Sequence, residues 1–310
     1  MDSTRKCNFL YRKDRSISDF GGMSFDSNNT NYRSLALSFC LNPHLGKPVE
    51  TLLKLCEDRS TSLERNIMHR KFANLLILLL GLSLAGCSPS PSVEHFNKGV
   101  DYQEQGQLAL AIEEYSKAID LDPEAANAYS NRGTAYLMMG DLERAIIDYD
   151  QAIALDPEDA DTYTNRGIVY DKKGDLERAI TDYDRAIALD PEAAEAYFNR
   201  GIAFFVKNDL DRAIADFDQA IGINPQDTQS YTNRGYTYAA KGDFDRAIAD
   251  FDQVIDINPQ DTLAYYNRGR AYAELGEQEK AISDIERALE LGLESCYERE
   301  AEELLAKLRQ

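Results

Sequence analysis

The sequence predicts an all-α fold, a solenoid built from six helix-turn-helix repeats. Two observations support this: residues recur with a period of 34, and the apolar side chains within each period follow α-helical spacing. Glycine recurs at positions 99, 133, 167, 201, 235 and 269, and alanine at positions 111, 145, 179, 213, 247 and 281. A single helical hairpin cannot bury its apolar face alone, so we expect the six hairpins to stack into one core.

Each repeat is expected to contain two helices, A and B. We number the repeat positions from 1 to 34, starting at residues 92, 126, 160, 194, 228 and 262. In the third repeat, helix A places Tyr163, Gly167 and Tyr170 on one side, at positions 4, 8 and 11. The glycine lets the paired helix approach closely. Gly174 can then adopt the left-handed conformation that ends helix A, and Asp175 can cap the start of helix B.

Helix B of the third repeat, residues 176–189, is expected to turn Ala179 and Tyr183 inward. The prolines that end the other repeats are missing from the sixth, which has Leu293 instead. Residues 296–310 then predict one further helix, polar on one side. We interpret it as a C-terminal cap that solubilises the open end of the stack.

The repeat pattern resembles the tetratricopeptide repeat (TPR) family. The family's aromatic, glycine and alanine positions and its closing proline appear in the second repeat as Tyr129, Gly133, Tyr136, Ala145, Tyr149, Ala152 and Pro157. The resemblance extends over residues 92–295. It implies a right-handed superhelical solenoid whose A helices line a concave surface that binds a protein or an extended peptide.

Position 6 of helix A is asparagine in every repeat. An asparagine amide offers a donor and an acceptor, so a row of them can pair with the main chain of an extended peptide. This arrangement resembles the asparagine ladder of other peptide-binding TPR superhelices. The peptide-binding candidates are Asn131, Asn165, Asn199, Asn233 and Asn267. The alternative is that the asparagines were duplicated with the repeat and are only solvated.

The fourth repeat differs from the others at the variable positions of helix A. Phe198, Ile202, Phe205 and Val206 are expected to form an exposed apolar patch on the groove wall, with Tyr236 beside it. Such a patch would give selectivity for a partner. The alternative is that the repeat packs irregularly and buries the patch. Lysines are missing at positions 2 and 5, so we do not expect the carboxylate clamp of other TPR domains.

The charged residues inside the repeats predict structure rather than catalysis. We expect the position-7 arginines to form charge pairs with the helix-B aspartates Asp148, Asp182, Asp216 and Asp250. Paired acids such as Asp182 and Asp184 are interpreted as a solvated helix-B face. His95 stands where later repeats have tyrosine and is interpreted as a packing substitute. We find no phosphate loop, metal cluster or nucleophile–base pair, so we expect no enzyme activity, cofactor or small-molecule substrate.

The stretch before the repeats has the layout of an export signal. Met68 is followed by the basic residues 69–71, the apolar residues 75–84 and the small residues 85–86, before Cys87. The apolar stretch is too short to span a bilayer, which takes about 20 residues. The ending resembles the lipobox of bacterial lipoproteins, which implies that Cys87 is the lipid-attachment site and the N-terminus of the processed protein. A chance apolar segment or an uncleaved anchor remains the alternative.

This interpretation divides the N-terminal part of the chain into three segments. Residues 68–86 are the expected signal peptide, and residues 87–91 are the lipidated cysteine with a short Ser/Pro tether. Residues 1–67 precede the expected start and are predicted to be a non-native extension or disordered. The expected location is the bacterial cell envelope, anchored to a membrane by lipid, and the outer membrane where two membranes exist.

Charge limits the classes of partner. Residues 1–86 contain 12 basic and 8 acidic side chains, whereas the remainder contains 22 and 46, a net charge of −24. Nucleic acid is therefore not an expected partner, because binding phosphates needs a basic surface. We expect a membrane-anchored scaffold that binds a protein or peptide. A role as an envelope assembly factor agrees with this expectation. The alternative is a structural or self-associating spacer without a peptide ligand.

Overall fold

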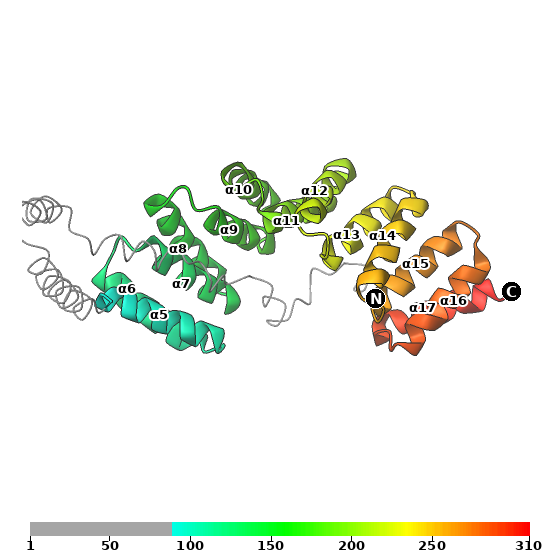
Figure 1. Ribbon diagram of the computed structural model, residues 1–310, viewed down its shortest axis with the longest axis horizontal. Helices are drawn as coiled ribbons and strands as arrows, with labels where there is room; N and C mark the ends of the chain where they lie inside the picture. Colours follow the sequence, from blue (N-terminus) through cyan, green and yellow to red (C-terminus); the bar gives the residue numbers. More distant parts are fainter. Residues whose placement is uncertain (1–88) are drawn as a thin grey trace, which may run out of the picture. The chain divides into compact units, whose positions relative to one another are not determined.

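The computed structural model describes residues 89–310, and its regular structure there is entirely helical (Figure 1). The described helices are α5 (Pro91–Glu104), α6 (Leu108–Leu121), α7 (Ala126–Met138), α8 (Leu142–Leu155), α9 (Ala160–Lys172), α10 (Leu176–Leu189), α11 (Ala194–Val206), α12 (Leu210–Ile223), α13 (Thr228–Ala240), α14 (Phe244–Ile257), α15 (Thr262–Glu274), α16 (Gln278–Glu290) and α17 (Ser295–Leu308). The prediction of an all-α repeat solenoid is confirmed. The predicted extension, signal peptide and lipidated Cys87 lie outside the described residues.

The helices form consecutive pairs, one pair for each repeat. The odd-numbered helices from α5 to α15 are the A helices, and the even-numbered helices from α6 to α16 are the B helices. Helix A packs against its own helix B and, from α7 onward, against helix B of the preceding repeat. Among the described residues, the repeats from His95 to Gln310 belong to one compact unit.

Within each pair, an aromatic or aliphatic side chain at position 24 packs closely against the glycine at position 8. A Cβ atom built on Gly167 would lie 2.6 Å from Cε1 of Tyr183, and one built on Gly133 would lie 2.9 Å from Cε1 of Tyr149. Both tyrosines are fully buried. The expected role of the glycine in close helix approach is therefore confirmed, because any larger residue would displace the ring.

The inward face of helix A differs from the one expected. Tyr163 at position 4 is only half-buried, whereas Thr162 at position 3 and Val169 at position 10 are completely buried. Positions 3 and 10 hold small or β-branched residues because they pack against the helix B of the preceding repeat. Ala128, for example, belongs to one apolar cluster with Ala118 and Ile119 of α6. A helix considered without its neighbouring repeat could not identify this second buried face.

The turn between helices A and B behaves as expected. Gly174 has φ +81°, the left-handed conformation that favours glycine, and the Asp175 side chain accepts a hydrogen bond from Arg178 N at 3.1 Å. In the fourth repeat Asn208 takes the glycine position with φ 61°. Asparagine tolerates this conformation better than most residues, so the turn is preserved.

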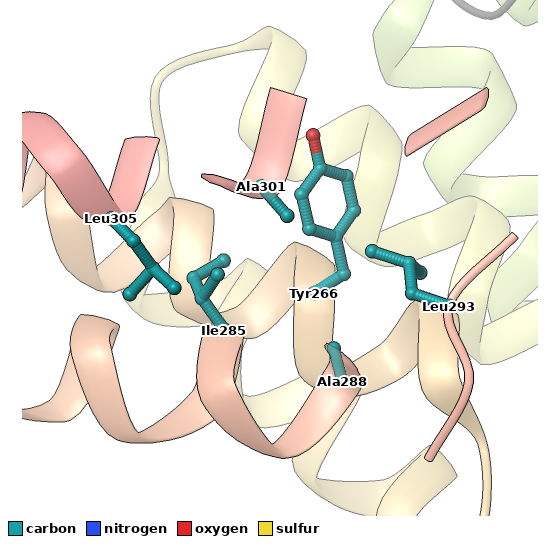
Figure 2. Packing of buried hydrophobic residues seen from close by; sticks show 6 residues of the cluster. All are labelled: Tyr266, Ile285, Ala288, Leu293, Ala301 and Leu305. Atoms are coloured by element: carbon teal, nitrogen blue, oxygen red, sulfur yellow. The ribbon is translucent and has the colours of Figure 1, made fainter. Parts of the chain in front are cut away.

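The C-terminal end of the stack is covered by α17. Ala301 and Leu305 of α17 are buried against Tyr266, Ile285 and Ala288, and Leu293 joins the same cluster (Figure 2). Replacing the usual proline with leucine therefore adds an apolar contact to the last interface. The expected capping role of this helix is confirmed.

The N-terminal end of the stack is polar. Position 10, which is buried and uncharged in the second to sixth repeats, is the exposed Asp101 in the first. Position 3 is likewise buried and uncharged in the second to sixth repeats, and it is the exposed Glu94 in the first. Burying these carboxylates against another helix would cost their hydration, so this face opposes the stacking of a further repeat or a second copy.

We expect Gly167→Ala to lower the free energy of unfolding by about 1–3 kcal/mol, because the new methyl group would overlap the buried Tyr183 ring. Gly222→Ala is the matched control. Gly222 lies in α12 with no heavy atom near a built Cβ, so alanine there should stabilise the helix by up to about 1 kcal/mol. Urea unfolding followed by circular dichroism measures both changes. A loss of stability at both positions would contradict the steric explanation.

Candidate functional site

The A helices are held in place by the arginines at position 7. Arg166 donates from Nε and Nη2 to both carboxylate oxygens of Asp182, at 2.8 and 2.7 Å, and from Nη1 to Asp150 of the preceding repeat at 2.7 Å. The same arrangement recurs in the next three repeats. Arg200 binds Asp216 and Asp184, Arg234 binds Asp250 and Asp218, and Arg268 binds Asp284 and Asp252. The predicted charge pairs are confirmed.

These pairs are structural because their inner carboxylates are buried. Asp182 is only 4% exposed, so its interpretation as part of a solvated helix-B face is wrong; Asp184 is exposed and bonds to Arg200. Hydrogen bonding to Asp284 raises the pKa of Arg268 above its usual value. The guanidinium stays charged, and the bidentate geometry fixes the direction in which helix A lies.

In the first repeat, the acid equivalent to Asp148 is Glu114, and it pairs with His95 of position 4. His95 Nδ1 lies 2.6 Å from Glu114 Oε2, and Glu114 also accepts from Lys117 at 2.7 Å. The hydrogen bond to His95 lowers the pKa of Glu114. His95 is half-buried in this contact, which agrees with a packing role.

The position-6 asparagines bond to their own helices. The amide nitrogens of Asn131, Asn199, Asn233 and Asn267 donate to the carbonyl four residues earlier, at 2.9, 2.9, 2.8 and 2.6 Å. Only the nitrogen can donate, so this bond fixes the orientation of each amide. Asn131 and Asn165 are half-buried, and the other three are buried.

The oxygen atoms of three of these amides are not completely buried. Among buried side-chain nitrogen and oxygen atoms of residues 89–310, only Gln103 Nε2 lacks a hydrogen-bond partner. The Oδ1 atoms of Asn199, Asn233 and Asn267 accept no hydrogen bond from the chain, so they must keep contact with solvent. The row therefore offers hydrogen-bond acceptors to a ligand, whereas part of its amide N–H donors already bond within the chain.

We call positions 2, 6, 9 and 13 of the A helices the asparagine face, because this spacing places them on one side of a helix. From the second repeat to the sixth, the exposure of the side chain at position 9 increases. Thr134 and Ile168 are buried, Ile202 and Tyr236 are half-buried, and Arg270 is exposed. Among repeats two to six, the accessible part of this row therefore lies in repeats four to six.

The expected apolar patch of the fourth repeat is only partly accessible. Phe198 is 7% exposed and its ring lies 6.0 Å from that of Phe217 in the same repeat, so the expectation that it is exposed is wrong. Ile202 and Phe205 are half-buried against the same cluster, and Val206 is half-buried at position 13. The accessible apolar surface is thus formed by the partly exposed sides of these three residues.

Position 5 is a structural position, which sequence reasoning missed. Ser130 lies 2.7 Å from Thr162 of the next repeat, oxygen to oxygen, and Tyr266 packs against Tyr297 of α17 with ring centroids 5.6 Å apart. These side chains fill the space between neighbouring units. The helical spacing of one helix does not reveal them, because the contact depends on the stacking of repeats.

Two contacts between neighbouring repeats were also missed. Asn267 Nδ2 donates to Tyr236 Oη at 2.8 Å, which joins positions 6 and 9 of adjacent repeats. Lys173 Nζ lies 2.6 Å from Glu143 Oε1, joining position 14 to position 18 of the preceding repeat. The sequence does carry a signal for the second contact, because lysine and an acid recur 30 residues apart in repeats two to five.

Residues 89–310 show neither a metal site nor a membrane-spanning helix. This part of the chain holds no group of three or more histidine, cysteine, aspartate or glutamate side chains placed to bind a metal ion. None of its helices combines the length and apolar character needed to cross a membrane.

We expect Arg200→Gln to lower the free energy of unfolding by about 3–5 kcal/mol, because Asp216 would be left buried with an unpaired charge. Arg178→Gln removes an exposed guanidinium that pairs with Asp175 three residues away, and should change stability far less. Urea unfolding measures the difference. Equal losses in the two variants would show that the buried arginine pair has no special role.

Comparison with known proteins agrees with the geometry of the repeats. Models described as tetratricopeptide repeat match residues 164–228, 126–159 and 262–292, and one described as TPR repeat matches residues 99–140 and 235–276. No curated protein sequence matches the chain.

Several solved structures are similar. The crystal structure of MamA is 30% identical, with a TM-score of 0.50 over 51% of this chain and 93% of that one. YrrB, described as a TPR protein with an unusual peptide-binding site, is 26% identical, with a TM-score of 0.54 over 61% and 97%. Pseudomonas aeruginosa pilF is 18% identical, with a TM-score of 0.61 over 70% and 97%, which shows the fold alone.

These matches support a protein–protein interaction scaffold, and TPR proteins are typically interaction modules without enzyme activity. The repeat geometry, the family models and the likeness to MamA together show that the chain belongs to the tetratricopeptide repeat family.

Proposed function

We propose that the protein is a membrane-anchored scaffold that binds an extended segment of a partner protein along its asparagine face. The observation that carries this proposal is the row of accessible Oδ1 acceptors on Asn199, Asn233 and Asn267. Their amides are fixed in orientation before a ligand arrives, which lowers the entropic cost of binding. An extended main chain offers N–H donors that match such a row.

Selectivity would come from the side chains between the asparagines. Ile202, Phe205 and Val206 present partly exposed apolar surface, and Tyr236 lies beside Asn267. An apolar side chain of the ligand would gain about 25 cal/mol per Å² of apolar area removed from water here. The likeness to YrrB, whose description names a peptide-binding site, supports a peptide ligand.

Both ends of the stack disfavour the end-to-end association by which a self-associating spacer would grow. The N-terminal face carries the exposed Asp101, and α17 covers the C-terminal face. Self-association would therefore have to use a side of the solenoid. Size-exclusion chromatography over a range of concentrations distinguishes this alternative from a monomeric scaffold.

Peptides selected from a random display library by the full chain test the proposed surface. Ile202→Ala and Asn233→Ala should each weaken the binding of selected peptides by about fivefold or more, because each removes a contact on the asparagine face. Fluorescence anisotropy with labelled peptides measures the affinities.

Ile147→Ala is the matched control for Ile202→Ala. Ile147 is 65% exposed on helix B of the second repeat, away from the asparagine face, so its truncation should leave peptide affinity unchanged. Binding that is insensitive to both asparagine-face substitutions, or a library that yields no binder, would contradict the proposal.

The proposed anchor rests on the lipobox-like ending at Cys87. In protein isolated from its native membrane, we expect mass spectrometry to find a diacylated Cys87 at the N-terminus and no peptide from residues 1–86. Cys87→Ser should remove the lipid and release the protein from the membrane fraction. An unmodified chain that begins at Met1 would contradict the anchor and leave the binding surface unaffected.

A further inference from the structure

Arg270 is an exposed arginine without an ion pair in a strongly acidic protein. No carboxylate of the described residues lies within 4.0 Å of its guanidinium nitrogens. Between residues 89 and 310, the only other arginine without such a pair is Arg185. Acids outnumber bases 46 to 22 in residues 87–310, so a guanidinium left unpaired is available to an external carboxylate.

The guanidinium is held over a fixed aromatic ring. Arg270 Cζ lies 5.5 Å from the ring centroid of Tyr266, a distance typical of cation–π contacts. Tyr266 is 2% exposed, its Oη donates to Glu300 at 3.3 Å, and α17 packs against it (Figure 2). The C-terminal cap thus supports the ring that positions Arg270.

An oriented acceptor lies one helical turn away on the same face. Asn267, three residues before Arg270, donates to Leu263 O at 2.6 Å and to Tyr236 Oη at 2.8 Å. Both amide hydrogens are then used, so Asn267 offers only its oxygen to a ligand. An acceptor and a guanidinium side by side suit a residue that has a main-chain N–H and a carboxylate side chain.

We propose that Arg270 binds an aspartate or glutamate side chain of the extended segment, while Asn267 accepts a hydrogen bond from that segment's main chain. This inference rests on the proposed function and adds the chemistry of the ligand. The ligand would carry an apolar side chain toward repeat four and an acidic one toward repeat six. Because the rest of the protein is acidic, the residues around that acid would be neutral or basic.

The display library of random 12-residue peptides tests this with four proteins: the full chain, Arg270→Gln, Arg270→Lys and Arg185→Gln. Peptides selected by the unchanged chain should contain an acidic residue at a constant distance from an apolar one. Resynthesised with an amidated C-terminus, they should lose about fivefold in affinity when that acid becomes its amide. The amidated end removes the terminal carboxylate as an alternative anchor.

Arg270→Gln should abolish the selection of the acid and the difference between acid and amide peptides. Arg185→Gln removes the same charge from helix B of the third repeat and should preserve both. Arg270→Lys should keep the preference for the acid with reduced affinity, because lysine retains the charge and loses the bidentate geometry. Thermal unfolding of each variant checks that the fold is intact.

Selected peptides without a preferred acid, or an unchanged preference in Arg270→Gln, would overturn the inference and leave the peptide-binding function standing. Equal losses in Arg270→Gln and Arg185→Gln would also overturn it, because the effect would then come from net charge alone. A library that yields no binder would contradict the peptide-binding function and this inference together.

Discussion

The bridge from each position-7 guanidinium to two B helices is the interaction on which the rest of the structure depends. Arg166 joins its own helix to Asp182 within the repeat and to Asp150 in the preceding one. A lysine could not do this, because its point charge lacks the planar fork that fits both oxygens of one carboxylate and reaches a second. The buried small residues at positions 3 and 10 bring helices together, and the arginine sets the angle and register at which they meet.

That constraint also explains why the asparagine face is regular. Position 6 precedes the arginine, so fixing the guanidinium fixes the direction in which the asparagine points. The bond from the amide to the carbonyl four residues earlier then removes its remaining freedom. The acceptor oxygens of Asn199 and Asn233 are therefore arranged before any ligand is present, at the cost of one donor each. A ligand gains a preformed row of acceptors and does not have to order it.

The sequence predicts most of the contacts that lie within one repeat and misses contacts that join two repeats. Gly167, Tyr183 and the turn at Gly174 follow from helical spacing and glycine geometry, which are local properties. Phe198 was expected to be exposed because helical spacing places it opposite one core face. Its burial against Phe217 of the same repeat depends on how helix A packs on helix B, which the spacing of one helix does not determine. The bond between Asn267 and Tyr236 was missed because it crosses a repeat boundary.

Along each A helix, the positions that hold the repeats together are different from the position that varies from repeat to repeat. Positions 3, 7, 8 and 10 keep a narrow range of residues in repeats two to six because each has a packing or pairing partner that recurs every 34 residues. Position 9 does not keep one residue type. From the second repeat to the sixth it changes from Thr134 through isoleucine and Tyr236 to Arg270, and its exposure increases in the same order. A repeated structural constraint would have preserved one residue type there. A ligand that spans several repeats presents a different side chain to each of them, so variation at an accessible position is what binding along the array requires. The residues at position 9 in repeats four to six therefore indicate the chemistry of the ligand better than the recurring framework residues do.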